Sequence, residues 1–407
     1  MIPGPLPSNS RVRPIPLSAY TMTSCLGAGL APARRALRAG ASGLAPNRFE
    51  TVDLETFVGE IAGVDAQALP RPLAAFDCRN NRAAELGLSQ DGFIAAVEKA
   101  ASRHGRARIG VFMGTSTAGI LQTELAYRRR APDGSLPPDF DYRRTHNTFS
   151  IAEYVRTRLG LEGPCAAIST ACSSSAKAFA SAARLIEAGL IDAAVVGGVD
   201  TLCLTTLYGF DSLQLLSRDP CRPYDAARDG ISIGEAAAFA LLEREGDGGA
   251  MHLLGAGESC DAHHMSAPHP EGLGARLAME RALDSAGLAA ADVDYVNLHG
   301  TATPSNDAAE DRAVTSLLGA AVPCSSTKGM TGHALGAAGG LEALIAVLAI
   351  EEGLIPGSPG TRTIDPQLRA NYVVSGREAA IAVAMSNSFG FGGSNCSLVF
   401  GRPARTA

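Results

Sequence analysis

The sequence predicts an α/β fold with a mainly parallel sheet, built from two similar halves. Two observations support this prediction: short apolar runs alternate with amphipathic or alanine-rich stretches, and one strand–turn–helix pattern occurs twice. Alternation of strands and helices is typical of sheets covered by helices on their faces. The chain has 407 residues, 46% of them hydrophobic, which is enough for one large core or two fused ones.

The expected elements follow from these runs in chain order. Strands are expected at 108–114, 164–169, 193–199, 238–243, 293–299 and 380–388. Helices are expected near 172–189, 271–286, 307–318 and 335–352. Residues 120–145, with their arginine clusters, predict an excursion beyond the core. The glycine-rich and charged segment 243–252 predicts a boundary between an N-terminal half, residues 1–248, and a C-terminal half, residues 249–407.

The repeated pattern joins an apolar strand to a helix that begins with small residues. In the first half this helix ends in "EAGLI" (187–191), and in the second half the corresponding helix ends in "EEGLI" (351–355). Glycine, alanine and serine allow helices to approach closely. We therefore expect the two helices to pack against each other near the centre of a duplicated α/β unit.

The composition excludes several classes of function. A formal net charge of −6 gives no overall basic surface, so nucleic acid is not an expected partner. No apolar run reaches the ~18 residues of a membrane helix, and residues 1–20 lack the order of a secretory signal. Nine cysteines without a C-x-x-C pair argue against a disulfide framework or a zinc site. We therefore expect a cytoplasmic protein.

Cys172 stands in the tract "STACSSS" (169–175), where a predicted strand turns into a predicted helix. The free N–H groups and the dipole at a helix start favour a thiolate, so this position lowers the pKa of a thiol and raises its reactivity. The alternative role for a cysteine here is that of a small buried hydrophobe.

Residues that could act together with the Cys172 thiol follow three predicted strands of the second half. His299 lies in "NLHGTATPSND" (297–307), and Lys328 and His333 lie in "TKGMTGHALGAAGG" (327–340). The third segment is the glycine-rich turn "SNSFGFGGSN" (386–395). Since α/β sheets form their sites beyond the carboxyl ends of strands, we expect these groups to meet. A structural role for either histidine is the alternative.

These motifs, together with "TACSSS", "GGVD" and "RPYDAARDG", resemble the β-ketoacyl-acyl carrier protein synthases, condensing enzymes of the Cys–His–His type. The resemblance implies the thiolase fold, a duplicated α/β unit in five layers αβαβα. It also implies a decarboxylative Claisen condensation. An acyl chain held on Cys172 would react with malonyl-acyl carrier protein to give β-ketoacyl-acyl carrier protein, CO₂ and free carrier protein.

The resemblance also implies catalytic roles. His299 and His333 would stabilise the enolate formed on decarboxylation, and Lys328 would tune His333. The backbone N–H groups of Cys172 and Phe391 would form the oxyanion hole. Further residues implied by the resemblance are Glu342, Asp307 and Glu310 in support of the site, and Thr301, Thr303, Thr117, Phe389 and Ile231 in contact with substrate.

No catalytic metal and no cofactor are implied, because the substrates travel on the phosphopantetheine arm of the carrier protein. A structural monovalent cation would lie near Asn297, Glu310, Glu342 and the backbone of 386–388. The expected partners are an acyl carrier protein and either a second copy of the chain or a subunit resembling a chain-length factor. Arginines 128–130 and 143–144 could dock the acidic carrier protein, with a solvated loop as the alternative.

Some positions depart from the family pattern: Ile231 replaces an aromatic residue, "GEAAA" (234–238) replaces a glycine-richer run, and Leu298 replaces a smaller residue. These departures indicate a specialised ketosynthase for a polyene or another polyketide-like chain. A thiolase is disfavoured because Cys396 falls within a predicted strand, where it could not serve as the second catalytic cysteine. His333 argues against the chain-initiating Cys–His–Asn enzymes, and Cys172 argues against a silent chain-length factor. Pairing with such a silent subunit stays open.

Overall fold

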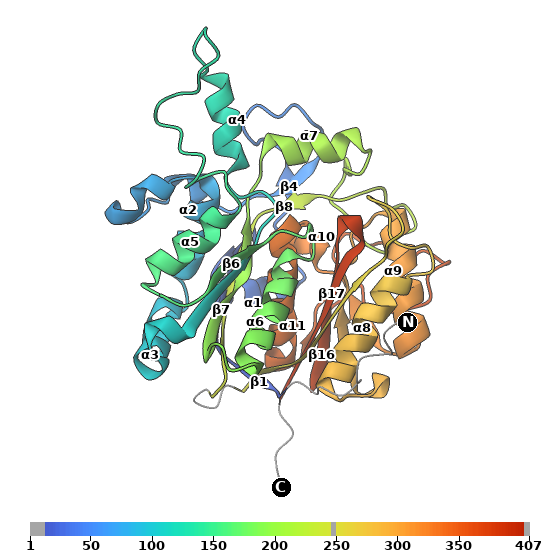
Figure 1. Ribbon diagram of the computed structural model, residues 1–407. Helices are drawn as coiled ribbons and strands as arrows, with labels where there is room; N and C mark the ends of the chain where they lie inside the picture. Colours follow the sequence, from blue (N-terminus) through green and yellow to red (C-terminus); the bar gives the residue numbers. More distant parts are fainter. Residues whose placement is uncertain (1–12, 246–249, 403–407) are drawn as a thin grey trace, which may run out of the picture.

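Two half-sheets with corresponding strand orders form the framework of the molecule (Figure 1). The computed structural model describes residues 13–245 and 250–402. In the N-terminal half the strands lie in the order β6 (Cys165–Ile168), β5 (Ile109–Gly114), β7 (Ala193–Asp200), β9 (Ala236–Glu243) and β1 (Ile15–Ser24). In the C-terminal half the order is β12 (Pro323–Ser325), β11 (Tyr295–Asn297), β16 (Val383–Phe389), β17 (Ser394–Gly401) and β10 (His252–Cys260). Each of these five strands thus has a counterpart at the same place in the other half, which confirms the predicted duplication.

The sheet is mixed rather than mainly parallel. Parallel pairs join β5 to β6 and β7, and β11 to β12 and β16. The strands β9, β1, β17 and β10 pair in antiparallel fashion. The short turn at 390–393 between β16 and β17 allows only antiparallel pairing, because parallel neighbours need a long crossover. A short antiparallel contact between β1 and β10 joins the halves into one sheet.

Two helices lie between the half-sheets: α6 (Ser174–Glu187) and α11 (Ala338–Glu352). Every residue of α11 from Ala338 to Ile350 is buried. The two helices approach so closely that the N–H of Gly340 donates to the hydroxyl of Ser175 at 2.7 Å. A Cβ at Gly339 would stand 2.9 Å from the backbone nitrogen of Ala176. The small residues therefore allow the close central contact that the sequence predicts.

The outer helices complete five layers in the order αβαβα. α2 (Arg79–Leu88), α3 (Phe93–His104) and α5 (Phe149–Arg158) cover the N-terminal half-sheet, and α8 (Leu273–Ala286) and α9 (Pro304–Leu318) cover the C-terminal one (Figure 1). The expected helices correspond to α6, α8, α9 and α11. The expected strand 293–299 is shorter, because only Tyr295–Asn297 pair with neighbours. No helix of the described chain is long and apolar enough to cross a membrane.

Smaller elements surround these layers. They are α1 (Leu30–Ala39), α4 (Ile120–Arg128), α7 (Leu204–Ser212), α10 (Lys328–Thr331), β2 (Gly27–Ala28), β3 (Ala45–Pro46), β4 (Phe57–Gly59), β8 (Ile233–Gly234), β13 (Leu354–Ile355), β14 (Asn371–Tyr372) and β15 (Arg377–Glu378). The predicted excursion at 120–145 is α4 and the loop after it, which project from the top of the molecule in Figure 1. The predicted boundary at 248/249 includes residues that lie outside the described chain.

Candidate active site

Cys172 lies at the junction between β6 and α6, just before the first helical residue, Ser174. Ala171, directly before it, has φ of 53°, in the left-handed region that residues other than glycine rarely adopt. The Ser174 hydroxyl accepts a hydrogen bond from the N–H of Thr170 at 2.9 Å and holds this turn. The turn fixes the direction of the Cys172 side chain, of which only 7% is exposed.

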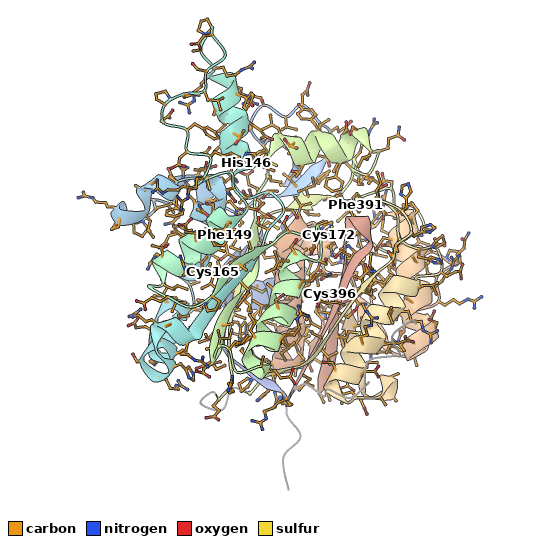
Figure 2. The ribbon with its side chains drawn as sticks, in the orientation of Figure 1. His146, Phe149, Cys165, Cys172, Phe391 and Cys396 are labelled. Atoms are coloured by element: carbon orange, nitrogen blue, oxygen red, sulfur yellow. The ribbon has the colours of Figure 1, made fainter. Side chains whose placement is uncertain are left out.

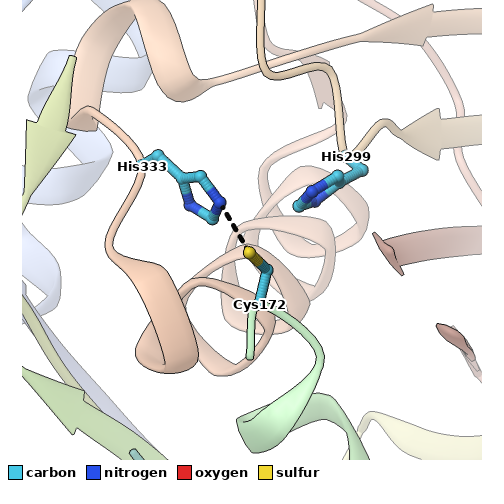
Figure 3. Close-up of side chains that lie close together, drawn as sticks. All are labelled: Cys172, His299 and His333. Carbon is cyan, nitrogen blue, oxygen red and sulfur yellow. Dashed lines mark hydrogen bonds between the residues drawn. The ribbon is translucent and has the colours of Figure 1, made fainter. Parts of the chain in front are cut away.

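The structure brings Cys172 together with both predicted histidines. Nε2 of His333 lies 3.1 Å from the Cys172 sulfur (Figure 3), and the rings of His299 and His333 are 5.3 Å apart at 83°. The sulfur and one ring nitrogen of each histidine all lie within 4.8 Å of one another. The cysteine spacing argued against a zinc site, yet the fold assembles three groups that ligate soft metals from distant segments.

Separate elements fix the two histidines. The backbone of His333 pairs with the segment around β8: its N–H donates to Ser232 at 2.7 Å, and its carbonyl accepts from Gly234 at 3.0 Å. His299 follows β11, and the Glu310 carboxylate on α9 accepts from the N–H groups of His299 at 2.8 Å and Gly300 at 2.7 Å. Both histidines are thereby positioned through their main chains, which leaves their rings to face Cys172.

Lys328 contacts His299 rather than His333, the residue it was predicted to tune. Its fully buried ammonium donates to the carbonyl of His299 at 2.5 Å and lies 3.4 Å from Nδ1 of that ring. It also forms the expected ion pair with Glu342. Burial and the charge of Lys328 lower the pKa of both His299 and His333 well below the usual value. Both rings are therefore neutral at pH 7, each with one N–H and one lone pair.

The Cys172 thiol is not activated in the way its sequence position suggests. Burial raises the pKa of Cys172 to about 11, against the opposing effects of the Lys328 charge and of the N–H of Phe391. Desolvation of the charged sulfur therefore outweighs the favourable donors near the helix start. The resting thiol is protonated, and neutral His333 is placed to accept its proton.

The glycine-rich turn 390–393 packs directly on the Cys172 backbone. A Cβ at Gly390 would stand 3.3 Å from the nitrogen of Cys172. Figure 2 shows Phe391 beside Cys172, near one end of the central helices. Cys396, by contrast, is fully buried within β17. Burial raises the pKa of its thiol, so it is unsuited to the role of a catalytic base.

One cavity reaches Cys172 and both histidines. Its walls include four of the five residues predicted to contact substrate, Thr301, Thr303, Phe389 and Ile231, and also Phe391, predicted for the oxyanion hole. The hydroxyls of Thr301 and Thr303 are 2.9 Å apart, and both residues line this cavity.

The same cavity contains residues that the sequence did not single out. Phe210 of α7 lies with its ring 5.7 Å from that of Phe391, and Leu215 and Pro268 form further apolar wall. An apolar residue in a helix gives the same sequence signal whether it lines a core or a cavity.

Thr117 and Asp307 are among the predicted residues that do not line this cavity. Thr117 is buried and its hydroxyl donates to the carboxylate of Asp200 at 2.8 Å, so its contact with substrate stays a prediction. Asp307 accepts from the N–H groups of Tyr224 at 2.9 Å and Ala302 at 3.2 Å. Its support for the site is thus indirect, through the turn that carries Thr301.

Two of the arginines expected to dock a carrier protein form close ion pairs with local carboxylates. Arg129 pairs with Asp139 at 3.1 Å, and Arg144 pairs with Asp141 at 3.0 Å. These pairs reduce the positive charge available to an acidic partner, so docking at this segment stays a prediction.

The residues expected near a monovalent cation carry unused oxygen donors. Within the described chain, Asn297 Oδ1, Glu342 Oε2 and Ser388 Oγ are buried without a hydrogen-bond partner. Burial raises the pKa of Glu310 and of Glu342 to about 7. Hard cations prefer such oxygen ligands, and an unpartnered buried oxygen is costly. The donor set therefore fits a cation.

A duplicated five-layer α/β fold with a buried thiol between two neutral histidines defines an acyl-transferring condensing enzyme. Comparison with known families gives the same assignment. The model of the "Beta-ketoacyl synthase, N-terminal domain" matches residues 17–248, and that of the "Beta-ketoacyl synthase, C-terminal domain" matches residues 251–362. The chain belongs to the β-ketoacyl synthase family.

Similar proteins cover from 72% to 98% of the chain. A 3-oxoacyl-[acyl-carrier-protein] synthase 2 of Vibrio cholerae is 34% identical over 96% of this chain and 99% of its own length. The nodulation protein E of Rhizobium meliloti is 36% identical over 72% of this chain and 75% of its own. Among solved structures, a ketosynthase in complex with its chain length factor from Xenorhabdus doucetiae has a TM-score of 0.88 and 38% identity, covering 98% of this chain and 100% of that one.

Proposed function

We propose that this chain is a chain-elongating β-ketoacyl-acyl carrier protein synthase that condenses an acyl group held on Cys172 with a malonyl group. The observation that supports it best is the 3.1 Å contact between the Cys172 sulfur and Nε2 of His333, beside His299, at the end of one cavity. A buried thiol with a base in hydrogen-bond reach is the arrangement that nucleophilic catalysis requires.

The first half-reaction loads Cys172. His333 accepts the thiol proton as the sulfur attacks the thioester carbonyl of the incoming acyl group. The N–H groups of Cys172 and Phe391 are the donors for the oxygen that becomes negative. The tetrahedral adduct then expels the carrier-protein thiolate, which takes a proton back from His333, and both histidines are again neutral.

The second half-reaction removes CO₂ from the malonyl thioester. Neutral imidazoles can donate N–H groups to the thioester carbonyl oxygen, so His299 and His333 stabilise the enolate as the C–C bond to the carboxylate breaks. In this step His333 carries its single proton on Nε2, having kept the Cys172 proton there and returned the Nδ1 proton to the carrier-protein thiolate. The enolate carbon attacks the acyl–Cys172 carbonyl, the β-ketoacyl chain leaves on the carrier protein, and the Cys172 thiolate takes up one proton from solvent. The low pKa of both histidines supports this role, because a protonated pair would repel each other and Lys328.

Within this proposal residues 1–248 supply the nucleophile and residues 249–407 supply both histidines and Lys328. Asn297, Glu310, Glu342 and the strand 386–388 would hold a monovalent cation, which would neutralise buried carboxylate charge. No cofactor takes part. All nine cysteines are free thiols in the structure, which supports a reducing compartment, the cytoplasm.

We further propose that the chain pairs with a subunit resembling a chain-length factor through the β6 edge of the sheet. β6 is the last strand on that side, and all four of its residues, Cys165–Ile168, are half-buried. Phe149 at the start of α5 is 38% exposed beside it (Figure 2). An unpaired apolar edge is a template for strand pairing. The ketosynthase from Xenorhabdus doucetiae, 38% identical, is described in complex with its chain length factor.

Mass spectrometry of the intact protein tests the function directly. The chain is incubated with a panel of acyl-carrier-protein thioesters, alone and with purified chain-length-factor candidates, and the acyl adduct is mapped to a peptide. We expect the adduct on Cys172, and β-ketoacyl product with CO₂ once malonyl-carrier protein is added. A chain that is folded but takes no acyl group under either condition, or takes it on another cysteine, contradicts the proposal.

A further inference from the structure

Asp200, the last residue of β7, is a fully buried carboxylate that lies outside the cavity. Most of its partners are neutral donors of one loop, residues 115–117. It accepts from the hydroxyls of Thr115 at 2.6 Å and Thr117 at 2.8 Å, and from the N–H groups of Ser116 at 2.9 Å and Thr117 at 2.8 Å. This number of convergent donors shows that the carboxylate holds the loop after β5 in one conformation.

That loop contacts the turn of the nucleophile. The hydroxyl of Ser116 donates to the carbonyl of Ala171 at 3.4 Å. Ala171 is the left-handed residue directly before Cys172. A residue in this conformation persists only where its surroundings hold it there. The contact with Ser116 belongs to those surroundings.

Asp200 also reaches the turn of His333. The N–H of Ala337, four residues after His333, donates to the second carboxylate oxygen at 3.2 Å. Leu335 between them is left-handed, with φ of 49°. A Cβ at Gly336 would stand 2.8 Å from the Asp200 oxygen and 2.7 Å from the Ser116 hydroxyl. The three segments are therefore packed against one another without spare room.

We propose that Asp200 is a positioning residue that sets the contact between Cys172 and His333 by clamping the turn of each to the end of β7. The proposal rests on the proposed function for its catalytic meaning, but the geometry it concerns is independent of substrate. Only a carboxylate suits the place, since it offers about four acceptor sites and no donor. An asparagine would turn an NH₂ group toward one of the N–H or O–H donors.

The test is the alkylation of Cys172 by iodoacetamide at pH 7, resolved by peptide mapping. In Asp200→Asn we expect the rate at Cys172 to fall about five- to tenfold, because His333 no longer takes the thiol proton at hydrogen-bond distance. Cys260, which is exposed, is the internal reference, and the buried Cys324 and Cys396 report unfolding. Asp192→Asn is the matched control: it lies just before the opposite end of β7, pairs with Arg108 at 2.7 Å, and should leave Cys172 unchanged.

A double-variant cycle separates positioning from general support of the fold. If Asp200 acts through His333, Asp200→Asn added to His333→Ala should slow alkylation by less than about twofold beyond His333→Ala alone. If the rate losses of the two single variants multiply in the double variant, the proposal is overturned. An unchanged rate in folded Asp200→Asn would also overturn it. If Cys324 and Cys396 become reactive in Asp200→Asn, that variant is unfolded, and Thr115→Val is then the variant that tests the proposal. It removes one donor, and we expect a two- to fivefold loss at Cys172, whereas an unchanged rate refutes the clamp. Acylation of the parent enzyme does not enter these readouts, so failure of the proposed function is seen separately.

Discussion

Replacing Lys328 by Met is expected to move the acid limit of malonyl decarboxylation to higher pH. The ammonium lies 3.4 Å from Nδ1 of His299, and its charge contributes to the low pKa of both histidines. A unit charge at this distance is worth about 5 kcal/mol at an effective dielectric constant of about 20. The nearby Glu342 carboxylate offsets much of this energy. We therefore expect the midpoint of the acid side of the pH–rate profile to move up by about one to two pH units.

The same substitution tests the buried ion pair. Removing one partner of such a pair typically costs about 3–5 kcal/mol, because the other charge is left buried and unpaired. The pKa of Glu342 is already about 7, so this carboxyl escapes part of the cost by taking up a proton. The double variant Lys328→Met with Glu342→Gln should therefore unfold at a denaturant concentration closer to that of the parent than Lys328→Met alone.

The assay is CO₂ release from malonyl-carrier protein between pH 4.5 and 8, with circular dichroism at each pH to confirm folding. Lys177→Met is the control, because Lys177 pairs with Glu258 away from the cavity. If the acid-side midpoint of CO₂ release in folded Lys328→Met stays within about 0.3 pH units of the parent value, the electrostatic role of Lys328 is refuted.

Further predictions concern the other site residues. Cys172→Ala should abolish acyl transfer while the circular dichroism spectrum stays native, and residual condensation near the parent rate would contradict its role as nucleophile. His299→Ala should slow CO₂ release about 10²-fold or more and Cys172 acylation much less, measured by stopped flow; the reverse order would contradict the division of roles. Burial raises the pKa of Glu310 from 4.5 to about 7, so the folded state binds its proton more tightly than the unfolded state and this group's contribution to stability falls as pH rises from 4.5 to 7. Glu310→Gln should remove that slope from the pH dependence of urea unfolding, and an unchanged slope would assign it to other groups. Phe210→Ala removes the ring that packs on Phe391 and should raise KM for long acyl-carrier substrates more than for short ones; an equal change across chain lengths would place Phe210 away from the acyl path.

Much of the architecture is predictable from the sequence because it depends on local periodicity. The strand–turn–helix pattern around Cys172 and its repeat before α11 indicate the duplication, and the structure confirms it. The small residues of both central helices predict their contact, which Gly340 and Ser175 make directly. These signals are contiguous in the chain, so no tertiary information is needed to read them.

The electrostatics of the site are not predictable in this way. The helix start at Cys172 suggests a lowered thiol pKa, but desolvation by burial raises it to about 11. Lys328 is five residues from His333 in sequence, yet the turn between them directs its ammonium to His299. Both results depend on which distant segments surround a group.

The contacts of Thr117 also could not be predicted from the sequence near it. The family resemblance implies that Thr117 contacts substrate, and it gives no sign that the Thr117 hydroxyl donates to the buried carboxylate of Asp200. The residues next to Thr117 in the sequence do not indicate that the carboxylate of Asp200, more than eighty positions later, is its partner. Contacts between side chains from separate strands are visible only once the strand order is known.

The correspondence of β6 with β12 has a consequence for how many reactions the molecule performs at once. α6 follows the first of these strands and α11 the second, so the turns that carry Cys172 and His333 occupy equivalent places in the two repeats. They face each other closely enough for a hydrogen bond between Cys172 and His333. Two copies of one structural unit thus share a single centre, to which one copy contributes sulfur and the other imidazole. Neither repeat holds a complete site, and duplication of the unit has produced asymmetry in chemistry rather than a second turnover.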